Sequence, residues 1–211
     1  VYTAEDFGIV PNTEDDMSGN IDSAVKAIEK LGGGILQFAE GDYIANYFAL
    51  ASGVILNGAG KERTRLVNTD TRNYRYRFST KAKKEGNVGV SNLTVYSPTQ
   101  ESVPVQTYFI LDGNDSSCEN IFFSDVNIIV GEGLKSISNA VGILGLYQRL
   151  LIQNCSFDGI PTSGYIRKYG KFLNNEFRYT YTSPALFAEY STIYNNKTIN
   201  PQVEAGNIDT T

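Results

Sequence analysis

The chain has 211 residues and carries 18 lysines and arginines against 23 aspartates and glutamates, a net charge of −5. A mildly acidic chain of this length can form one domain with a sizeable core, and it is not built to bind nucleic acid. Histidine and tryptophan are absent. The lack of histidine excludes Ser-His-Asp triads, Cys-His pairs and imidazole metal sites. No apolar run approaches the roughly 18 residues of a membrane span, so we expect no membrane insertion.

The amino-terminal region predicts one amphipathic helix followed by strands. Apolar residues recur at helical spacing at Ile21, Ala24, Val25, Ile28 and Leu31, and Gly32 supplies a stop. Ser18 or Asn20 can cap the start, and we interpret the acidic loop 14–16 as a solvated segment favouring the helix rather than a cation site. Strands are expected at 35–39, 43–49 and 53–56. A helix in this place would cover the open first coil of a repeat structure.

One short pattern then recurs along the chain. It occupies 87–95, 120–128, 149–157, 169–177 and 190–198, and a weaker copy covers 52–60. Each copy has apolar residues at period two interrupted by one Asn or Asp, which indicates two short strands joined by a sharp bend. Successive copies start roughly 20 to 35 residues apart, a period typical of stacked units that cannot bury their apolar faces alone.

Aligning the copies predicts three inward-facing rows and one bend row. The inward rows are Val90, Phe123, Ile152, Phe172 and Ile193; Leu93, Val126, Cys155, Asn175 and Asn196; and Val95, Ile128, Phe157, Phe177 and Thr198. The bend row is Asn92, Asp125, Asn154, Asn174 and Asn195, with Asn57 as its weaker first member. Asparagine tolerates the left-handed backbone that a bend needs, and stacked amides can bond along the column. We interpret this row as a turn ladder rather than a binding stripe.

Stacked strand–bend–strand units predict an all-β fold, a single-stranded right-handed parallel β-helix with an N-terminal capping α-helix. We expect the N-terminal strand and capping helix at 1–34, the β-helix coils at 35–199 and a C-terminal tail at 200–211. Because the chain begins at Val1 and its last coil would leave an open edge, we expect a fragment of a longer protein.

The two cysteines do not make a disulfide framework. Cys155 falls in an inward row and is predicted to be a small buried hydrophobic residue. Cys118 belongs to a different part of the coil, so no bridge between the two is expected. Outward-facing Phe122 and Leu151, on neighbouring coils, predict either a subunit interface or a strip covered by a loop of the same chain.

The first 65 or so residues also resemble a known family. The motifs that carry the resemblance are Asp6-Phe7-Gly8, the loop 12–16 before the helix, 33–38, Gly41-Asp42-Tyr43 and 53–60. They are similar to the opening of pectate-lyase-like superfamily proteins, which include polysaccharide lyases, hydrolases and epimerases and many bacteriophage tailspikes and appendage proteins. The resemblance implies a β-helix and a polysaccharide partner. The His-containing signature of the epimerase branch and the paired-Asp signature of polygalacturonases are absent, so no catalytic residue carries over.

Two groups of residues are candidates for carbohydrate binding. Alternation in the basic stretch 72–84 places Tyr74, Tyr76 and Phe78 on one face and Arg75 and Arg77 on the other. This pattern favours either a surface for an anionic polymer, with stacking beside guanidinium groups, or a half-buried strand charged for solubility. Polar residues at strand ends complete the candidate set, which is Arg75, Tyr76, Arg77, Asp112, Asp115, Arg167, Lys168 and Glu189. Neither a metal nor a cofactor is expected.

Three functions remain open from the sequence. The first is a phage tailspike or appendage domain that binds cell-surface polysaccharide during host attachment, as a homotrimer on the virion. The second is a secreted bacterial polysaccharide lyase or glycoside hydrolase acting on an acidic polysaccharide. The third is a non-catalytic structural spacer. A fold by itself does not separate them, because unrelated activities share one architecture.

Overall fold

The computed structural model describes the backbone of residues 1–69, 75–78, 87–98, 107–111, 120–130, 140–144, 146–158, 160–162, 165–178 and 190–199. Within these ranges, strands 75–78, 107–111, 140–144, 146–148, 160–162 and 165–168 are described by their backbone alone. The predicted tail 200–211 lies outside the described residues, and the three predicted chain divisions stay a prediction.

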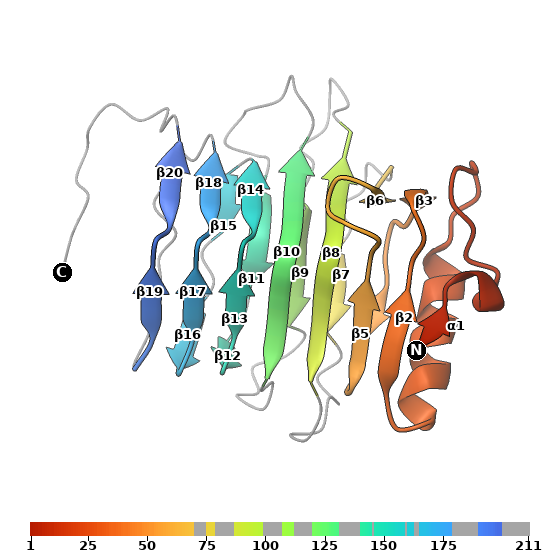
Figure 1. The fold of residues 1–211 in the computed structure, drawn as a ribbon, viewed down its shortest axis with the longest axis horizontal. Coiled ribbons are helices and arrows are strands. Elements are labelled where there is room, and N and C mark those ends of the chain that lie inside the picture. The colour runs from red at the N-terminus through yellow and green to blue at the C-terminus, as the bar shows by residue number, and fades with distance from the viewer. Residues whose placement is uncertain are drawn as a thin grey trace.

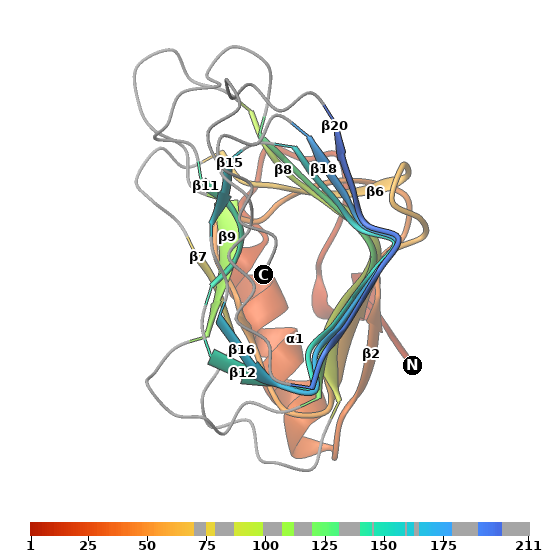
Figure 2. The same ribbon diagram turned by 90° about the vertical axis from the view of Figure 1, so that its left-hand side faces the viewer.

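The described strands wind into three parallel sheets around one interior (Figure 1, Figure 2). The largest has 13 described strands: β1 (Tyr2–Thr3), β2 (Gly34–Gln37), β3 (Gly41–Ile44), β5 (Val54–Asn57), β6 (Thr64–Val67), β8 (Val88–Ser97), β10 (Ile121–Val130), β13 (Leu151–Gln153), β14 (Ser156–Asp158), β17 (Lys171–Leu173), β18 (Glu176–Arg178), β19 (Thr192–Tyr194) and β20 (Lys197–Ile199). The second sheet contains β4 (Ala49–Leu50), β7 (Arg75–Phe78), β9 (Thr107–Leu111), β11 (Ala140–Leu144) and β15 (Ile160–Thr162), and the third contains β12 (Leu146–Gln148) and β16 (Tyr165–Lys168). The predicted right-handed parallel β-helix is confirmed.

The predicted inward rows follow the strand register. In the first row Phe123 pairs with both Val90 and Ile152, and these three side chains are at most 3% exposed. The same row continues to Phe172 and then to Ile193, which is 55% exposed at the far end of the described coils. The other two rows keep their predicted partners as well. Apolar alternation at period two therefore identified the core side of each strand correctly.

The bend row is confirmed as a left-handed turn ladder. Its members have φ between 50° and 57°: Asn92, Asp125, Asn154, Asn174 and Asn195. Side-chain amides bond down the column, with Asn154 Nδ2 donating to Asp125 Oδ1 at 3.2 Å and Asn195 Nδ2 donating to Asn174 Oδ1 at 2.9 Å. In β8 and β10 the strand runs through this bend, whereas in later coils the bend separates β13 from β14, β17 from β18 and β19 from β20.

The weak first copy of the repeat sits one residue out of the predicted alignment. Asn57 pairs with Ser91, so Gly58 and not Asn57 reaches the level of Asn92. Asn57 still joins the ladder from this position, because its Oδ1 accepts from Asn92 Nδ2 at 2.8 Å and from Ser91 Oγ at 2.6 Å.

A second left-handed column lies at the start of the repeat and was not predicted. It contains Gly53, Asn120, Arg149, Tyr169 and Tyr190, with φ between 54° and 74°. Glycine and asparagine are common in this conformation, but arginine and tyrosine are not. Alternation of apolar residues carries no signal for this column, because the turn precedes the first strand of each copy.

The helix α1 (Ser18–Lys30) follows a short 3-10 turn η1 (Glu5–Phe7) and covers one end of the stack (Figure 1). Its apolar face is buried as expected at Ile21, Ala24, Val25 and Ile28, which are at most 1% exposed. The prediction is wrong for Leu31, which follows the last residue of the helix and is 68% exposed. The predicted stop is also confirmed, since Gly32 has φ of 92° and its N–H donates to Glu29 O. The expected strand 43–49 is wrong in part, because Ala45 and Phe48 turn a buried corner between β3 and β4.

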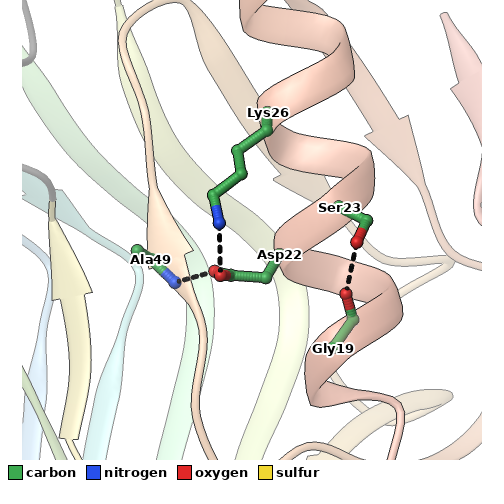
Figure 3. A network of polar contacts seen from close by, with 5 residues as sticks. All are labelled: Gly19, Asp22, Ser23, Lys26 and Ala49. Atoms are coloured by element: carbon green, nitrogen blue, oxygen red, sulfur yellow. Dashed lines mark hydrogen bonds and ion pairs between the residues drawn. The ribbon is translucent and has the colours of Figure 1, made fainter.

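The helix also supplies acceptors to the edge strand of the second sheet. Asp22 Oδ1 accepts from the Ala49 N–H at 2.9 Å, while its Oδ2 pairs with Lys26 Nζ at 3.1 Å (Figure 3). Ser18 Oγ accepts from the backbone N–H of Asn46 at 2.8 Å and of Tyr47 at 3.1 Å. Because β4 is the last described strand of its sheet, these bonds satisfy donors that would otherwise form an open edge.

The helix start is capped by neither of the predicted residues. Asp16 Oδ1 accepts from the Ser18 N–H at 2.9 Å, as the interpretation of the acidic loop anticipated. Partial burial raises the pKa of the Asp16 carboxyl, but hydrogen bonds from Ser18 and Asn46 outweigh it and lower that pKa below its ordinary value.

Candidate functional site

The residues singled out from the sequence that the structure describes lie in two different sheets. Arg75, Tyr76 and Arg77 lie in β7, which is paired on both sides by β4 and β9. Arg167 and Lys168 lie in β16, in a different sheet, with β9 and β11 between β7 and the coil that contains β16 (Figure 1). Asp112, Asp115 and Glu189 lie outside the described residues. A carbohydrate-binding role for these residues stays a prediction.

A polar groove lies instead on the outer face of the largest sheet, beyond the bend row. It has a volume of about 370 Å³. Its charged lining residues are Lys61, Glu62, Asp158 and Glu176, and its uncharged ones are Asn127, Ile129, Asn154, Cys155, Ser156 and Asn174. These side chains come from the loop between β5 and β6 and from β10, β14, β18 and the bends, so the groove crosses successive coils.

The loop between β5 and β6 forms one wall because it is tied to the strands beside it. Lys61 O accepts from Thr94 Oγ1 in β8 at 2.5 Å, and Glu62 Oε1 accepts from Asn127 Nδ2 in β10 at 3.2 Å. Gly60 N–H also donates to Asn92 O at 3.0 Å. These bonds place one lysine and one glutamate beside strands that follow them in the sequence by 30 or more residues.

The floor of the groove is an outward column that the register builds. Asn127 pairs with Ser156, and Ser156 pairs with Glu176 in the next coil. Ser156 Oγ donates to Asn127 Oδ1 at 2.8 Å, which holds two members of this column together. Every member stands two residues after a bend residue, so the repeat alignment contained the column. The candidate residues predicted from charge did not include this column, because most of its members are amides and hydroxyls.

Two carboxylates in the groove come from neighbouring strands. Asp158 in β14 stands two residues beyond Ser156, which is the direct partner of Glu176 in β18. The strand spacing and rise of a parallel sheet put the Cα atoms of two such positions about 8 Å apart. The groove can therefore accept hydrogen bonds from sugar hydroxyls and holds two carboxylates on neighbouring strands.

The described part of the chain contains neither a cluster of metal-ligating side chains nor a helix that could span a membrane. Within the described ranges, no three His, Cys, Asp or Glu side chains gather where they could hold a metal ion. Among those same residues, no helix has the length and apolar character needed to cross a membrane.

Cys155 is buried beneath the groove and is not a reactive group. It is 2% exposed, it is not in a disulfide, and its Sγ lies 3.2 Å from Gln153 O. Burial is the main cause that raises the pKa of its thiol from 9.0 to about 12. The prediction of a small buried hydrophobic residue is confirmed, and Cys118 lies outside the described residues.

We expect Cys155 to react with iodoacetamide at pH 8 about a thousandfold more slowly in the folded protein than in urea, because only the thiolate reacts. The raised pKa means that its contribution to folding stability is complete below pH 9.0 and is lost as the pH rises towards about 12. Mass spectrometry of a Cys118→Ser variant isolates the signal. Equal rates in the folded and unfolded chain would contradict this expectation.

No protein-family model matches the sequence, and no curated protein matches it. Solved structures do match. The A-module of the mannuronan C-5 epimerase AlgE4 of Azotobacter vinelandii superposes with a TM-score of 0.62 and 18% identity, over 93% of this chain and 58% of that one. A candidate glycosyl hydrolase from Parabacteroides merdae gives 0.56 and 13%, over 93% of this chain and 97% of that one. PfbA, a surface adhesin of Streptococcus pneumoniae, gives 0.53 and 15%, over 94% and 62%.

These likenesses confirm the parallel β-helix fold of this chain. The chain spans 58% of the length of the epimerase module. At such low identity the comparisons speak for the architecture, and the activity has to be argued from the site.

Proposed function

We propose that this chain binds a polysaccharide in the groove between the loop 58–63 and the outer face of β10, β14 and β18. The observation that carries the proposal is the lining of that groove. Amide, hydroxyl and carboxylate groups from successive coils line this groove. A sugar chain presents hydroxyl donors and acceptors along its length that can bond to them. The epimerase and the candidate hydrolase among the structural neighbours are named for carbohydrate chemistry, which supports this class of ligand.

The charges in the groove favour neutral or amino-bearing sugars. Glu62, Asp158 and Glu176 contribute three carboxylates, and Lys61 is the one cation among the lining residues that the structure describes. An anionic polymer would meet repulsion from this surplus, and like charges brought together in a partly enclosed site are costly. The substrate preference proposed for the groove therefore differs from the acidic polysaccharide expected from the sequence.

Cleavage of the bound glycan is a second candidate function, favoured by the two carboxylates that Asp158 and Glu176 bring to the groove from neighbouring strands. One carboxyl would protonate the leaving oxygen and the other would act as base or nucleophile. The finer assignment, a homotrimeric phage appendage used in host attachment or else a secreted bacterial enzyme, stays a prediction. So does the structural spacer.

A glycan array spanning neutral, amino and acidic polysaccharides tests the proposal, with reducing-end and unsaturated-uronate assays on each hit. Asp158→Asn and Glu176→Gln are each expected to weaken binding about tenfold, because each removes a charge-assisted hydrogen bond. Glu14→Gln is the matched control, since Glu14 is exposed in the loop before α1.

Three outcomes distinguish a binding module, an enzyme and a groove that binds no glycan. Binding without turnover supports a binding module, and turnover that falls by about a hundredfold or more in either groove variant supports an enzyme. Failure of the unaltered chain to bind any glycan, or equal binding by all variants, contradicts the proposed groove.

A further inference from the structure

A second pocket lies before the bend row, on the other part of the coil from the groove. It has a volume of about 480 Å³ and is lined by Arg149, Leu150, Leu151, Tyr169 and Lys171. These residues belong to the turns that lead into β13 and β17 and to the first positions of those strands. None of the described residues that line the pocket also lines the groove.

The backbone at this pocket is left-handed where large side chains stand. Arg149, Tyr169 and Tyr190 have φ of 54°, 59° and 55° in three successive coils. Earlier coils use Gly53 and Asn120 at the same level, the residue types that tolerate this conformation best. Arginine and tyrosine are disfavoured there by their backbone, so the reason for their presence has to be sought in their side chains.

Those side chains form an exposed aromatic surface beside two cations. The rings of Tyr169 and Tyr190 are stacked, with centroids 5.7 Å apart and planes 19° from parallel. They remain 53% and 78% exposed, so the stack leaves aromatic surface open to solvent. Arg149 and Lys171 are exposed as well, and no carboxylate is among the described residues that line the pocket. The described lining of the pocket thus carries two positive charges in a chain whose net charge is −5.

Leu151 supplies the apolar wall of the pocket, and Phe122 continues it on the preceding coil. The two residues are direct register partners and both are half-buried. Phe122 lies over Gly89, where an added Cβ would stand 2.5 Å from the ring. The apolar strip predicted from the sequence is therefore real, and at its Leu151 end it opens into this pocket.

We propose that this pocket binds an acidic monosaccharide unit of a glycan, with its carboxylate on Arg149 and Lys171 and its ring against Tyr169 and Leu151. A guanidinium group binds a carboxylate through two parallel hydrogen bonds, and the C–H face of a sugar ring packs on aromatic and apolar surface. Inorganic phosphate would bind to the two cations but would not pack against the tyrosine rings. The pocket and the groove would thus prefer sugars of different charge.

Isothermal titration with tetrasaccharides of galacturonate, mannuronate, hyaluronan and sialic acid tests this pocket, with maltotetraose as the neutral probe. Arg149→Asn and Tyr169→Asn are the sharpest variants, because Asn120 shows that asparagine adopts this backbone in the same column. We expect both variants to keep or raise the melting temperature while weakening the acidic probe about tenfold, as should Lys171→Gln. Tyr194→Ser, at a 67% exposed tyrosine outside the pocket, should change nothing.

Several results would overturn the proposal. One is that the unaltered chain binds none of the four acidic probes, and another is that Arg149→Asn and Lys171→Gln bind them unchanged. A lower melting temperature for Tyr169→Asn with full binding would assign the tyrosines to stability alone. Glu176→Gln should still bind the acidic probes. If Glu176→Gln loses that binding while the pocket variants keep it, the acidic sugar binds in the groove and not in the pocket. Loss of neutral-glycan binding in Glu176→Gln tests the groove separately.

Discussion

Replacement of Gly58 by alanine is expected to destabilise the fold by about 3 kcal/mol or more, because a methyl group there has no space to occupy. A Cβ on Gly58 would stand 2.2 Å from Asn92 O, 2.8 Å from Leu93 Cβ and 2.9 Å from Thr64 Cβ. The nearest of these atoms is backbone and the others are attached directly to it, so none can swing away. Urea unfolding followed by circular dichroism measures the loss.

Gly19→Ala is the matched control for Gly58→Ala. Gly19 lies in the first turn of α1 with no atom within 4 Å of an added Cβ. Alanine is a better helix former than glycine, so this variant should gain up to about 1 kcal/mol. An unfolding midpoint for Gly58→Ala equal to that of the unaltered chain would show that the first coil does not approach Asn92 as described.

Replacement of Asn175 by alanine is expected to cost about 2–4 kcal/mol, because it removes hydrogen bonds from a buried site. Asn175 is 1% exposed and belongs to the second inward row. Its Oδ1 accepts from the Cys155 N–H at 3.0 Å, and its Nδ2 donates to Ile152 O at 3.0 Å and to Asn196 Oδ1 at 2.9 Å. Alanine leaves a buried N–H without this acceptor.

Asn195→Gly provides the comparison for Asn175→Ala. Asn195 is exposed, and glycine tolerates its left-handed backbone, so the stability should change by less than about 1 kcal/mol. Chemical unfolding of both variants gives the two values under one condition. A smaller loss for Asn175→Ala than for Asn195→Gly would show that the internal amide contributes no net stability.

Asn175 and Asn196 also show how far a repeat pattern can be trusted. The repeat alignment predicts both residues in an inward row, although asparagine is mostly exposed in folded proteins. The structure supplies the reason, because each Oδ1 accepts a backbone N–H from the neighbouring coil: Cys155 N to Asn175 at 3.0 Å, and Asn175 N to Asn196 at 2.9 Å. Satisfied amides can therefore replace apolar residues inside a coil.

The candidate groove was only partly within reach of the sequence. Its floor, from Asn127 through Ser156 to Glu176, follows from counting two residues past each bend. Its wall could not be found in this way, because Lys61 and Glu62 reach the groove through hydrogen bonds to Thr94 and Asn127 in later coils. The pocket was missed for a different reason, since Tyr169 and Tyr190 open the successive copies 169–177 and 190–198 at a position where apolar alternation gives no signal.

The sequence alone determined the β-helix, the inward rows, the bend ladder and the covering helix. Each depends on periodic burial or on one residue type with a backbone preference, and both are local properties. The tertiary structure decided the alignment of the first copy, the cap at Asp16 and which residues line the groove and which line the pocket. These depend on close approach between residues from different coils, such as Gly58 at Asn92 O, and the linear pattern holds no record of such distances.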